Sequence, residues 1–300
     1  MTREIRIGSR RSELAVIQTR LVMAAVVRRY PALTLTLVTM DTLGDLDQTR
    51  PLEGGDGKAL FTDTLEAALR EGRIDLCVHS LKDMPVEQPG DLYVAAFSKR
   101  ADPRDALILP QGQLFFGSET LSGAEIGCSS ARRRVQLQNI APHLKTADIR
   151  GNVPTRLNKL DSGQYGALVL AMAGLERLGL AQRASRIFDT DEMVPAAGQG
   201  ILAVQAHRGG DHAFLDAVND ADAALAAQAE LAVMRALDGG CSVPAAAYAE
   251  VHGQELRIKG MLADDGSIYK DVVLGQRKNG LELAEALAKR LKNGVSGIGK

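Results

Sequence analysis

The feature that most constrains this fold is one pattern that occurs twice along the chain. RIGSRRSELAVIQ (6–18) and EIGCSSARRRVQLQ (125–138) each join a strand-like start, Ile-Gly, a polar corner with serine and paired arginines, and a helix-like end. Around both copies, apolar positions alternate as in strands or recur at helical spacing, and the two patterns take turns. This alternation predicts α/β domains with mainly parallel sheets. We therefore expect two similar α/β lobes across a cleft, with both corners able to point into it.

The same patterns predict the individual elements. Strands are predicted at residues 4–9, 33–40, 74–80, 93–97, 125–130, 146–151 and 166–174, and helices at 12–29, 60–71, 131–140, 153–163 and 175–179. The long polar stretch at 41–58 has no periodicity, which is typical of a mobile lid. The last third differs, because a helix at 221–237, three strands and a terminal amphipathic helix predict a small α+β domain.

Composition excludes several classes of protein. Lys and Arg number 36 against 37 Asp and Glu, a net charge of -1, and aromatic residues make up 4% with no Trp. A nucleic-acid binder carries a basic surface and aromatic platforms for bases, so no nucleic-acid partner is expected. No apolar stretch reaches the roughly 18 residues of a membrane span, and the N-terminus has no signal core. Three widely spaced cysteines, at 77, 128 and 241, argue against disulfides and for the reducing cytoplasm.

Arginines gather where predicted strands turn into helices. They are Arg10, Arg11, Arg132, Arg133, Arg134, Arg150, Arg156 and Arg177. A corner that opens a helix offers free backbone N–H groups and a positive dipole end, and serines such as Ser12, Ser129 and Ser130 can donate further hydrogen bonds. Guanidinium adds bidentate recognition of carboxylate or phosphate. The alternative is that the arginines are solvated and form weak ion pairs. Because the arginine clusters recur at equivalent corners, a binding site for carboxylate or phosphate is favoured.

A second candidate is VHSLKDMPVE (78–87), where a predicted strand runs into a polar loop. Lys82 and Asp83 then lie at the carboxyl end of the strand, where open α/β sheets bind ligands. Asp83 could act there as an acid, a base or a stabiliser of a cation, or it could only initiate the turn before Pro85. His79 is expected to pack at the strand end, and the five scattered histidines indicate no metal site.

Cys241 is the third candidate, in the segment ALDGGCSVPAAA (236–247). Cys77 and Cys128 fall in or beside apolar strands and are expected to be core thiols. Cys241 follows two glycines, so it could be an exposed nucleophile, an attachment point or a small residue that fills a gap. No local motif pairs it with a histidine, and the residues alone leave these alternatives open.

These segments resemble the porphobilinogen deaminase (hydroxymethylbilane synthase) family over nearly the whole chain. The segments that carry the resemblance, in the family's order, are RIGSRRSELA, GDGKALF, VHSLKDMP, ADPRDA, GCSSARRRVQL, IRGNVPTRLNKL, LAMAGLERLGL, VPAAGQGILAVQ and LDGGCSVP. The resemblance implies an α/β fold with two lobes like those of type II periplasmic binding proteins around a cleft, and a small C-terminal α+β domain. The implied domains are 1–98 with 199–217, 103–195, and 221–300.

The resemblance also implies the chemistry. In this family the loop cysteine, here Cys241, holds a dipyrromethane cofactor through a thioether, and this cofactor is the primer. Four porphobilinogens are deaminated and joined in turn, and hydrolysis releases hydroxymethylbilane for porphyrin and heme biosynthesis. Each pyrrole carries an acetate and a propionate, which accounts for arginine clusters in a chain of balanced charge. The implied partners are porphobilinogen and the growing oligopyrrole, and the family expectation is a monomer.

Residue by residue, the resemblance assigns roles to the motif positions. Asp83 matches the catalytic carboxylate, which contacts pyrrole nitrogens and stabilises the azafulvenium cation left by loss of ammonia. Implied cofactor contacts are Cys241, Ser80, Lys82, Asp83, Cys128, Ser129, Ser130, Arg132 and Arg133. Implied substrate or chain contacts are Arg10, Ser12, Gln18, Arg150, Arg156 and Arg177, and the lid contributes Lys58 and Phe61.

Four positions depart from the family pattern, of which Asp238, in place of glutamate, is a conservative change. Glu13 stands where proline is frequent, Ala59 where glycine is usual and Cys128 where threonine is frequent. Two rival classes stay open beside the enzyme. A small-anion binding protein of the same fold would need neither Cys241 nor a third domain, and a cysteine hydrolase would need a histidine paired with Cys241.

Overall fold

The structure, a computed structural model of the chain, describes residues 4–42, 44, 56–115, 117–121, 123–237, 244–264 and 267–298. The chain divides into two compact units. The first comprises Met1–Ala101 and Ile201–Ala227, and the second comprises Asp102–Gly200 and Gln228–Lys300. The boundaries of the three domains implied by the resemblance stay a prediction.

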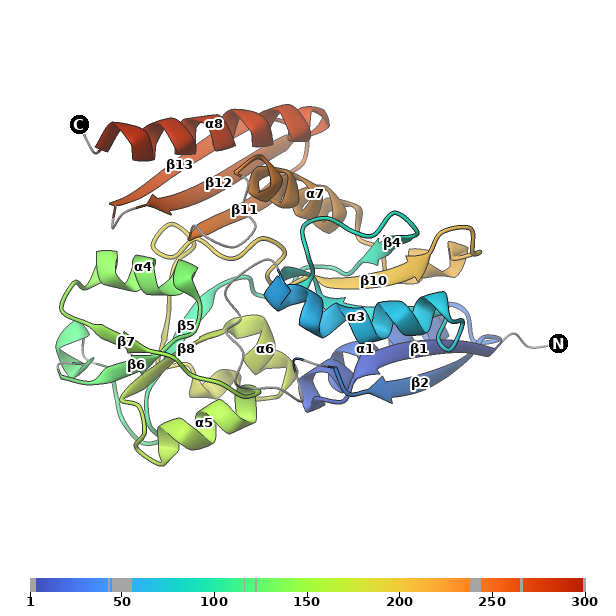
Figure 1. The fold of residues 1–300 in the computed structure, drawn as a ribbon, viewed down its shortest axis with the longest axis horizontal. Coiled ribbons are helices and arrows are strands. Elements are labelled where there is room, and N and C mark those ends of the chain that lie inside the picture. The colour runs from blue at the N-terminus through green and yellow to red at the C-terminus, as the bar shows by residue number, and fades with distance from the viewer. Residues whose placement is uncertain are drawn as a thin grey trace. The chain divides into compact units, whose positions relative to one another are not determined.

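The first unit is built around a five-stranded sheet in the order β2-β1-β3-β10-β4 (Figure 1). Its strands are β1 (Glu4–Arg10), β2 (Thr34–Met40), β3 (Leu76–Ser80), β4 (Leu92–Phe97) and β10 (Leu202–His207). β1 is parallel to β2 and β3, while β10 is antiparallel to β3 and β4. Helix α1 (Glu13–Arg29) packs beside Val78, and helix α3 (Asp56–Arg70) packs beside Cys77. Because successive residues of a strand point to opposite faces, the two helices cover opposite faces of this sheet.

The second unit repeats this arrangement. Its five-stranded sheet has the order β7-β6-β8-β5-β9, again with two parallel pairs followed by two antiparallel pairs. The strands are β5 (Asp105–Ile108), β6 (Glu125–Gly127), β7 (Lys145–Ala147), β8 (Ala167–Ala171) and β9 (Arg186–Ile187). β6 and helix α4 (Ala131–Ile140) hold the positions that β1 and α1 hold in the first sheet. The predicted repeat and the α/β fold class are therefore confirmed.

One strand in each sheet runs against the others. Four of the five strands in each sheet share one direction, as expected of mainly parallel sheets, while β10 and β5 run antiparallel to both of their neighbours. The sequence patterns also miss these two strands, since each is a short apolar run without alternation. Each begins within a few residues of a point where the chain passes from one unit to the other. Parallel neighbours are joined by a helix that crosses over between them. β5 and β10 are not reached through such a crossover, so their direction is not set to be parallel.

The Ile-Gly pair of the repeat has a steric reason in both sheets. A Cβ atom on Gly8 would lie 2.4 Å from Ile74 Cδ1, and one on Gly127 would lie 2.6 Å from Leu168 Cδ2. Both distances are far below the roughly 3.5–4.0 Å of carbon atoms in contact. Glycine is therefore required for a large side chain to cross this point of each sheet.

The chain after α7 (Ala221–Ala236) forms an antiparallel sheet covered by a helix. Its strands, in chain order, are β11 (Ala245–His252), β12 (Glu255–Asp264) and β13 (Ser267–Gln276). On one face, Leu287 and Leu291 of α8 (Gly280–Ile298) lie against Gly260. On the other, Met261 packs in an apolar cluster with Val194. The predicted α+β character of this part is confirmed.

The remaining helical segments are two helices close to predicted ones and several single turns that the sequence patterns did not predict. They are α5 (Val153–Asp161), α6 (Met172–Arg177) and the single turns η1 (Leu81–Asp83), η2 (Ser118–Leu121), η3 (Ala181–Arg183), η4 (Ala213–Ala217) and η5 (Arg277–Asn279). The strand predicted at 166–174 is too long, because α6 already begins at Met172. Among the described residues, no helix is both long and apolar enough to cross a membrane.

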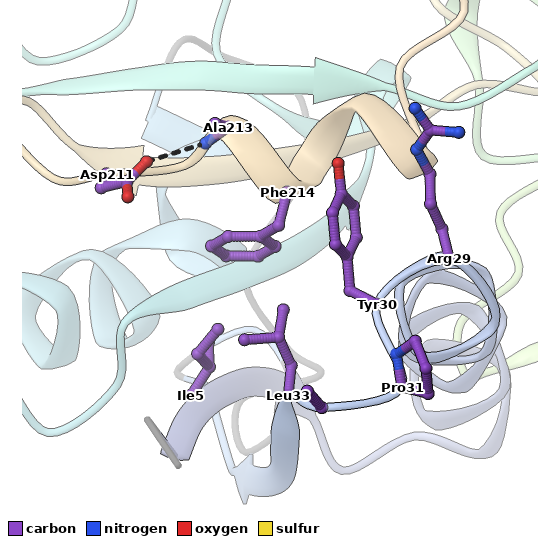
Figure 2. Close-up of a pocket in the computed structure, with 9 residues that line it drawn as sticks. Ile5, Arg29, Tyr30, Pro31, Leu33, Asp211, Ala213 and Phe214 are labelled. Atoms are coloured by element: carbon purple, nitrogen blue, oxygen red, sulfur yellow. Dashed lines mark hydrogen bonds between the residues drawn. The ribbon is translucent and has the colours of Figure 1, made fainter. Parts of the chain in front are cut away.

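A hollow of about 420 Å³ opens at the amino-terminal edge of the first sheet (Figure 2). Ile5 at the start of β1, Tyr30 after α1, Leu33 before β2 and Phe214 of η4 line it. The candidate residues that follow β1 and β3 lie at the opposite, carboxyl ends of these strands. The hollow is thus separate from the residues that the sequence singles out.

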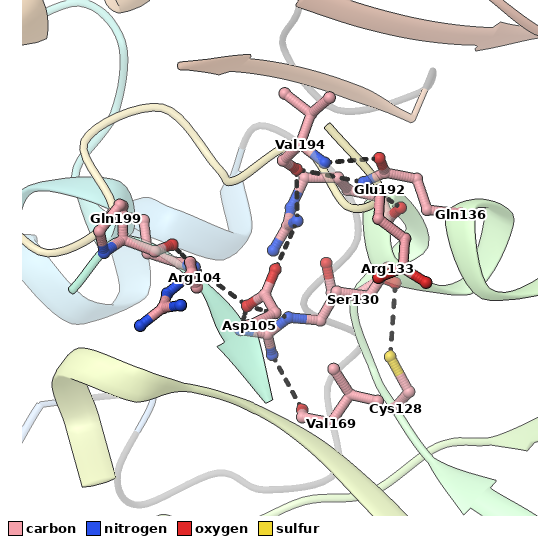
Figure 3. A network of polar contacts seen from close by, with 12 residues as sticks. Arg104, Asp105, Cys128, Ser130, Arg133, Gln136, Val169, Glu192, Val194 and Gln199 are labelled. Carbon is pink, nitrogen blue, oxygen red and sulfur yellow. Dashed lines mark hydrogen bonds and ion pairs between the residues drawn. The ribbon is translucent and has the colours of Figure 1, made fainter. Parts of the chain in front are cut away.

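Asp105, the first residue of β5, is a fully buried carboxylate that holds two arginines (Figure 3). Oδ2 accepts from Arg132 Nη1 at 2.8 Å, and Oδ1 accepts from Arg133 Nε and Nη2 at 3.0 and 2.7 Å. Gln199 Nε2 donates to the same carboxylate at 3.0 Å. Burial alone raises the pKa of Asp105, but the charges and hydrogen bonds of both arginines lower it, and the net pKa lies well below the ordinary 3.8. The carboxylate is therefore the anchor of the second sheet's polar core.

Asp105→Asn should lower the free energy of unfolding by about 3–5 kcal/mol, because two buried guanidinium groups lose their counter-charge. Equilibrium unfolding in urea measures this loss. In Asp216→Asn, the control, an ion pair with Arg29 that is open to solvent is removed, and the loss should be far smaller. Since the folded pKa of Asp105 is depressed, its contribution is complete above pH 3.8 and is lost as the pH falls further. A variant as stable as the wild type at pH 7 would contradict this account.

Candidate functional site

The carboxyl ends of β1 and β3 bring candidate residues to one edge of the first sheet. β1 and β3 are parallel, Arg10 ends β1 and Ser80 ends β3. Gln18 of α1 is buried and donates from Nε2 to Ser80 Oγ at 2.9 Å. Ser12 is the N-cap of α1, and its Oγ accepts from the N–H of Ala15 at 3.4 Å. Gln18 and Ser80 are thus in direct contact, while the Ser12 hydroxyl serves the helix start.

Asp83 ends η1, the single helical turn that follows β3, and its side chain is half-buried. It forms no hydrogen bond or ion pair with any other residue that the structure describes. An aspartate that only initiates a turn bonds its carboxylate to backbone groups a few residues on. Here the turn is closed by the N–H of Met84 and the carbonyl of Leu81 at 3.1 Å. The Asp83 carboxylate is therefore not used by the turn, which favours a ligand as its partner.

His79 is the residue of β3 directly before Ser80, and it is buried as predicted. The pKa of its imidazole is lowered to about 4, chiefly by burial and also by the charge of Arg10, while a hydrogen bond with Gln205 and the charge of Asp83 act in the opposite direction. Arg10 and Asp83 are thus both close enough to act on the ring. His79 is neutral near pH 7, so it adds no positive charge beside Asp83.

In the second unit, the polar corner after β6 is tied down by Ser129. Its Oγ accepts from the N–H of Ile149 at 3.0 Å and donates to the carbonyl oxygen of the same residue. Ser130 is the N-cap of α4, but its hydroxyl makes no capping bond and has no partner among the described residues. Cys128 is buried, its thiol lies 3.8 Å from the Ser130 carbonyl oxygen, and burial raises its pKa. Cys128 is confirmed as a core thiol, as is Cys77.

Arg132 and Arg133 of α4 are buried, so the alternative of solvated arginines does not hold for them. Arg133 directs Nε, Nη1 and Nη2 to Asp105 and to the carbonyl of Val169. Arg132 uses only Nη1, for Asp105 and the carbonyl of Val194, and no described residue accepts from its Nε or Nη2. One carboxylate is shared by two cations. A net positive charge is therefore left at the start of α4.

Three further arginines were predicted to bind anions. Arg177 donates from Nη2 to the carbonyl of Gly200 at 2.7 Å, and burial lowers its pKa to about 10. Neither Arg177 nor the half-buried Arg150 forms an ion pair with a carboxylate of the described residues. Arg156 donates from Nε to the carbonyl of Gly151 at 2.7 Å. A half-buried guanidinium without an ion pair keeps donors available to an anion, so Arg177 and Arg150 are candidates for binding an anionic ligand.

Several predicted site residues lie outside these observations. Cys241 is not among the described residues, and neither is most of the predicted lid at 41–58. The side chains of Lys58 and Phe61 also lie outside them. In contrast, the structure shows a role that the sequence analysis did not assign. Asp105 belongs to the ADPRDA segment, but its contact with α4 depends on residues 27 and 28 positions away.

Comparison with known proteins gives one fold-level neighbour and two relatives that match nearly the full length of the chain. Among solved structures, the periplasmic aliphatic sulphonate binding protein SsuA from Escherichia coli is 17% identical, over 79% of this chain and 71% of that chain, with a TM-score of 0.42. A porphobilinogen deaminase of Ruminiclostridium josui is 46% identical over 296 residues, which are 98% of this chain and 99% of that protein. One of Alkaliphilus oremlandii is 45% identical over 290 residues, 96% of this chain and 97% of that protein.

Two family models match consecutive parts of the chain. The model described as "Porphobilinogen deaminase, dipyromethane cofactor binding domain" matches residues 5–215, and "Porphobilinogen deaminase, C-terminal domain" matches residues 224–294. Together with the near full-length relatives, these matches show that the chain belongs to the porphobilinogen deaminase family.

Proposed function

We propose that this chain joins four porphobilinogens in turn on a dipyrromethane primer and releases hydroxymethylbilane. Family membership supports the reaction, and the observation that carries it in the structure is the half-buried Asp83 carboxylate without a described partner. When bound, the dipyrromethane supplies the pyrrole carbon to which the first porphobilinogen is joined. We further propose that Cys241 holds this primer through a thioether.

The described residues fit such a primer, whose pyrroles carry carboxylates and N–H groups. Arg132 has Nε and Nη2 left over, and the Ser130 hydroxyl stands unused at the start of α4. These donors suit carboxylates, because guanidinium and a helix N-terminus both favour negative charge. Asp83 is an acceptor that suits pyrrole N–H groups. Ser80, Lys82, Ser129 and Arg133 complete the proposed contacts to the primer.

Asp83 is the proposed catalytic residue. When the protonated aminomethyl group of porphobilinogen leaves as ammonia, the C–N electron pair departs with it and the methylene-pyrrole keeps the positive charge. A half-buried carboxylate stabilises that charge more strongly than water does, because the local dielectric is lower. After the new C–C bond forms, the ring carbon loses a proton, which the same carboxylate is suited to accept.

The carboxylates of substrate and growing chain are assigned to the second group of predicted residues. Arg150 and Arg177 are the strongest candidates, because neither has a carboxylate partner among the described residues. Arg10, Ser12, Gln18 and Arg156 are proposed to assist them, and Lys58 and Phe61 to act from the lid.

We also propose the wider organisation that the resemblance implies. The chain would form three domains, at 1–98 with 199–217, 103–195 and 221–300, and act as a monomer. A cytoplasmic location is supported by the free, buried thiols of Cys77 and Cys128, since such compartments keep thiols reduced.

With Cys241→Ser, the holoenzyme should not form, because an oxygen ether is a poor substitute for the thioether. Intact-mass spectrometry of the denatured wild-type protein should show a covalent dipyrrole, and the variant should show none and have no measurable turnover. A wild-type protein without any adduct would favour the small-anion binding protein or the hydrolase instead. A fully active, unmodified variant would overturn the role of Cys241.

Asp83→Asn should fold normally but lose at least about 10²-fold in kcat, because the neutral amide neither stabilises the cation nor accepts the proton. The variant is reconstituted with hydroxymethylbilane before assay, so that a defect in assembling the primer is bypassed. Circular dichroism and the melting temperature should match the wild type. Near-native turnover of the reconstituted variant would show that Asp83 is not the catalytic carboxylate and has only a structural role in the turn before Pro85.

Arg177→Met should raise KM for porphobilinogen about ten- to a hundredfold, because a charge-assisted bond of about 1.5–3 kcal/mol is lost. The melting temperature should change little, since Arg177 is half-buried and forms no ion pair among the described residues. The control is Arg183→Met in the same unit, where the ion pair with Asp161 is lost. Arg183→Met should lower the melting temperature and leave KM unchanged. If Arg177→Met instead lowers the melting temperature with KM unchanged, Arg177 is a structural residue.

A further inference from the structure

Gln205 of β10 is fully buried, and its amide makes four hydrogen bonds within the first unit. Oε1 lies 3.2 Å from His79 Nε2 and 3.4 Å from Cys77 Sγ. Nε2 donates to Glu66 Oε1 at 3.1 Å and to Gln88 Oε1 at 2.8 Å. A glutamine side chain offers two N–H donors and two acceptor lone pairs, so all of its capacity is used. Such a group is held rigidly, because each lost bond would leave a polar atom unpaired in an apolar site.

Glu66 determines which way the amide is turned. It belongs to α3, is buried, and lies 3.7 Å from the guanidinium of Arg70. An ionised carboxylate can only accept hydrogen bonds. The amide nitrogen of Gln205 must therefore face Glu66, and its oxygen must face β3.

The position of that oxygen in turn fixes the tautomer of His79. Two acceptors do not face each other at hydrogen-bond distance, so His79 Nε2 must carry a hydrogen toward Gln205 Oε1. The thiol of Cys77, 3.0 Å from the same nitrogen, then donates to Oε1 as well. Nδ1 is left as a bare acceptor on a ring that is neutral near pH 7. The charged groups that act on this ring are Arg10 of β1 and Asp83 of η1.

The same amide ties together the segments on both sides of Asp83. His79 lies on β3, before Asp83 in the chain. Gln88 comes after Asp83 and donates from Nε2 to the carbonyl of Pro85 at 3.0 Å. Through Glu66 the amide also reaches α3, whose first three residues fall within the lid predicted at 41–58. One side chain thus connects the strand before Asp83, the turn after it and the lid helix.

We propose that Gln205 is a positioning residue for Asp83, acting through the fixed tautomer of His79 and through the bond to Gln88. It does not touch the substrate. Its amide holds η1 at one position, so that the carboxylate meets the cation without reorganisation. The inference rests on the proposed role of Asp83, but the hydrogen-bond arrangement that it requires can be measured without turnover.

The first test is the tautomer in the holoenzyme. Long-range proton–nitrogen NMR of protein labelled with ¹⁵N-histidine, with His79 assigned by its loss in His79→Phe, should show hydrogen on Nε2 and none on Nδ1 near pH 7. Hydrogen on Nδ1 would overturn the proposal. If the wild type does not convert porphobilinogen, the proposed function is wrong, whereas the His79 tautomer is determined by NMR independently of turnover.

The second test is kinetic and uses Gln205→Met, which keeps the length of the side chain and removes the amide. The reconstituted variant should lose about tenfold or more in kcat, with KM changed less than about threefold, because a displaced carboxylate weakens only the chemical step. The His79 spectrum should change to a mixture of tautomers. Val204→Ala, on the opposite face of the same strand, is the matched control for lost stability and should keep kcat within about threefold.

Glu66→Gln serves as a second variant, because it retains shape and removes only the group that orients the amide. It should also mix the His79 tautomers and lower kcat, and it stands in if Gln205→Met does not fold. Unchanged kcat in a variant with mixed tautomers would overturn the proposal. An equal loss of kcat in Val204→Ala, or a loss with the tautomer unchanged, would overturn it too.

Discussion

The carboxylate of Asp105 is the interaction on which the second unit depends. Without it, the guanidinium groups of Arg132 and Arg133 would be buried beside each other with no negative charge. Like charges in a low-dielectric interior repel strongly, and desolvation adds to the cost. The carboxylate therefore determines where α4 starts relative to β5. The start of α4 is in turn where the polar corner of the repeat lies.

The charged groups of the candidate site fall into two sets. Arg133 and Asp105 are satisfied by the protein itself and set the geometry. Asp83 and Arg150 form no ion pair among the described residues, and Arg177 forms none either, although the charge of Glu176 acts on it. A chain with nearly equal numbers of acids and bases can pair most of its charges, so those that stay unpaired and half-buried are informative. Under the proposed function, the arginines of the second unit would bind carboxylates and Asp83 of the first would stabilise a cation.

The two sheets share one topology but stabilise their polar interiors differently. The second has a buried ion cluster around Asp105, whereas in the first the neutral amide of Gln205 lies between the buried Glu66 carboxylate and the side chains of β3. A neutral amide donates and accepts in fixed directions without adding charge. The Gln205 amide therefore orients the segments on both sides of Asp83 without adding a charge that would alter the field in which the cation forms. His79, neutral near pH 7, is consistent with the same requirement.

The sequence by itself determined the elements whose signal is local. The repeated Ile-Gly corner, the helix from Ser12 and the apolar strand around Cys77 follow from the spacing of residues along the chain. The steric reason for the two glycines, contact with Ile74 and Leu168, came from the structure. The motifs also sufficed for the family, because its segments are long and keep their order. Only the tertiary structure decided the direction of β5 and β10 and the partners of buried polar groups. Asp105 meets α4 across 27 residues and Gln205 meets Glu66 across 139; such contacts leave no periodic trace in the chain, because they form only when distant strands pair.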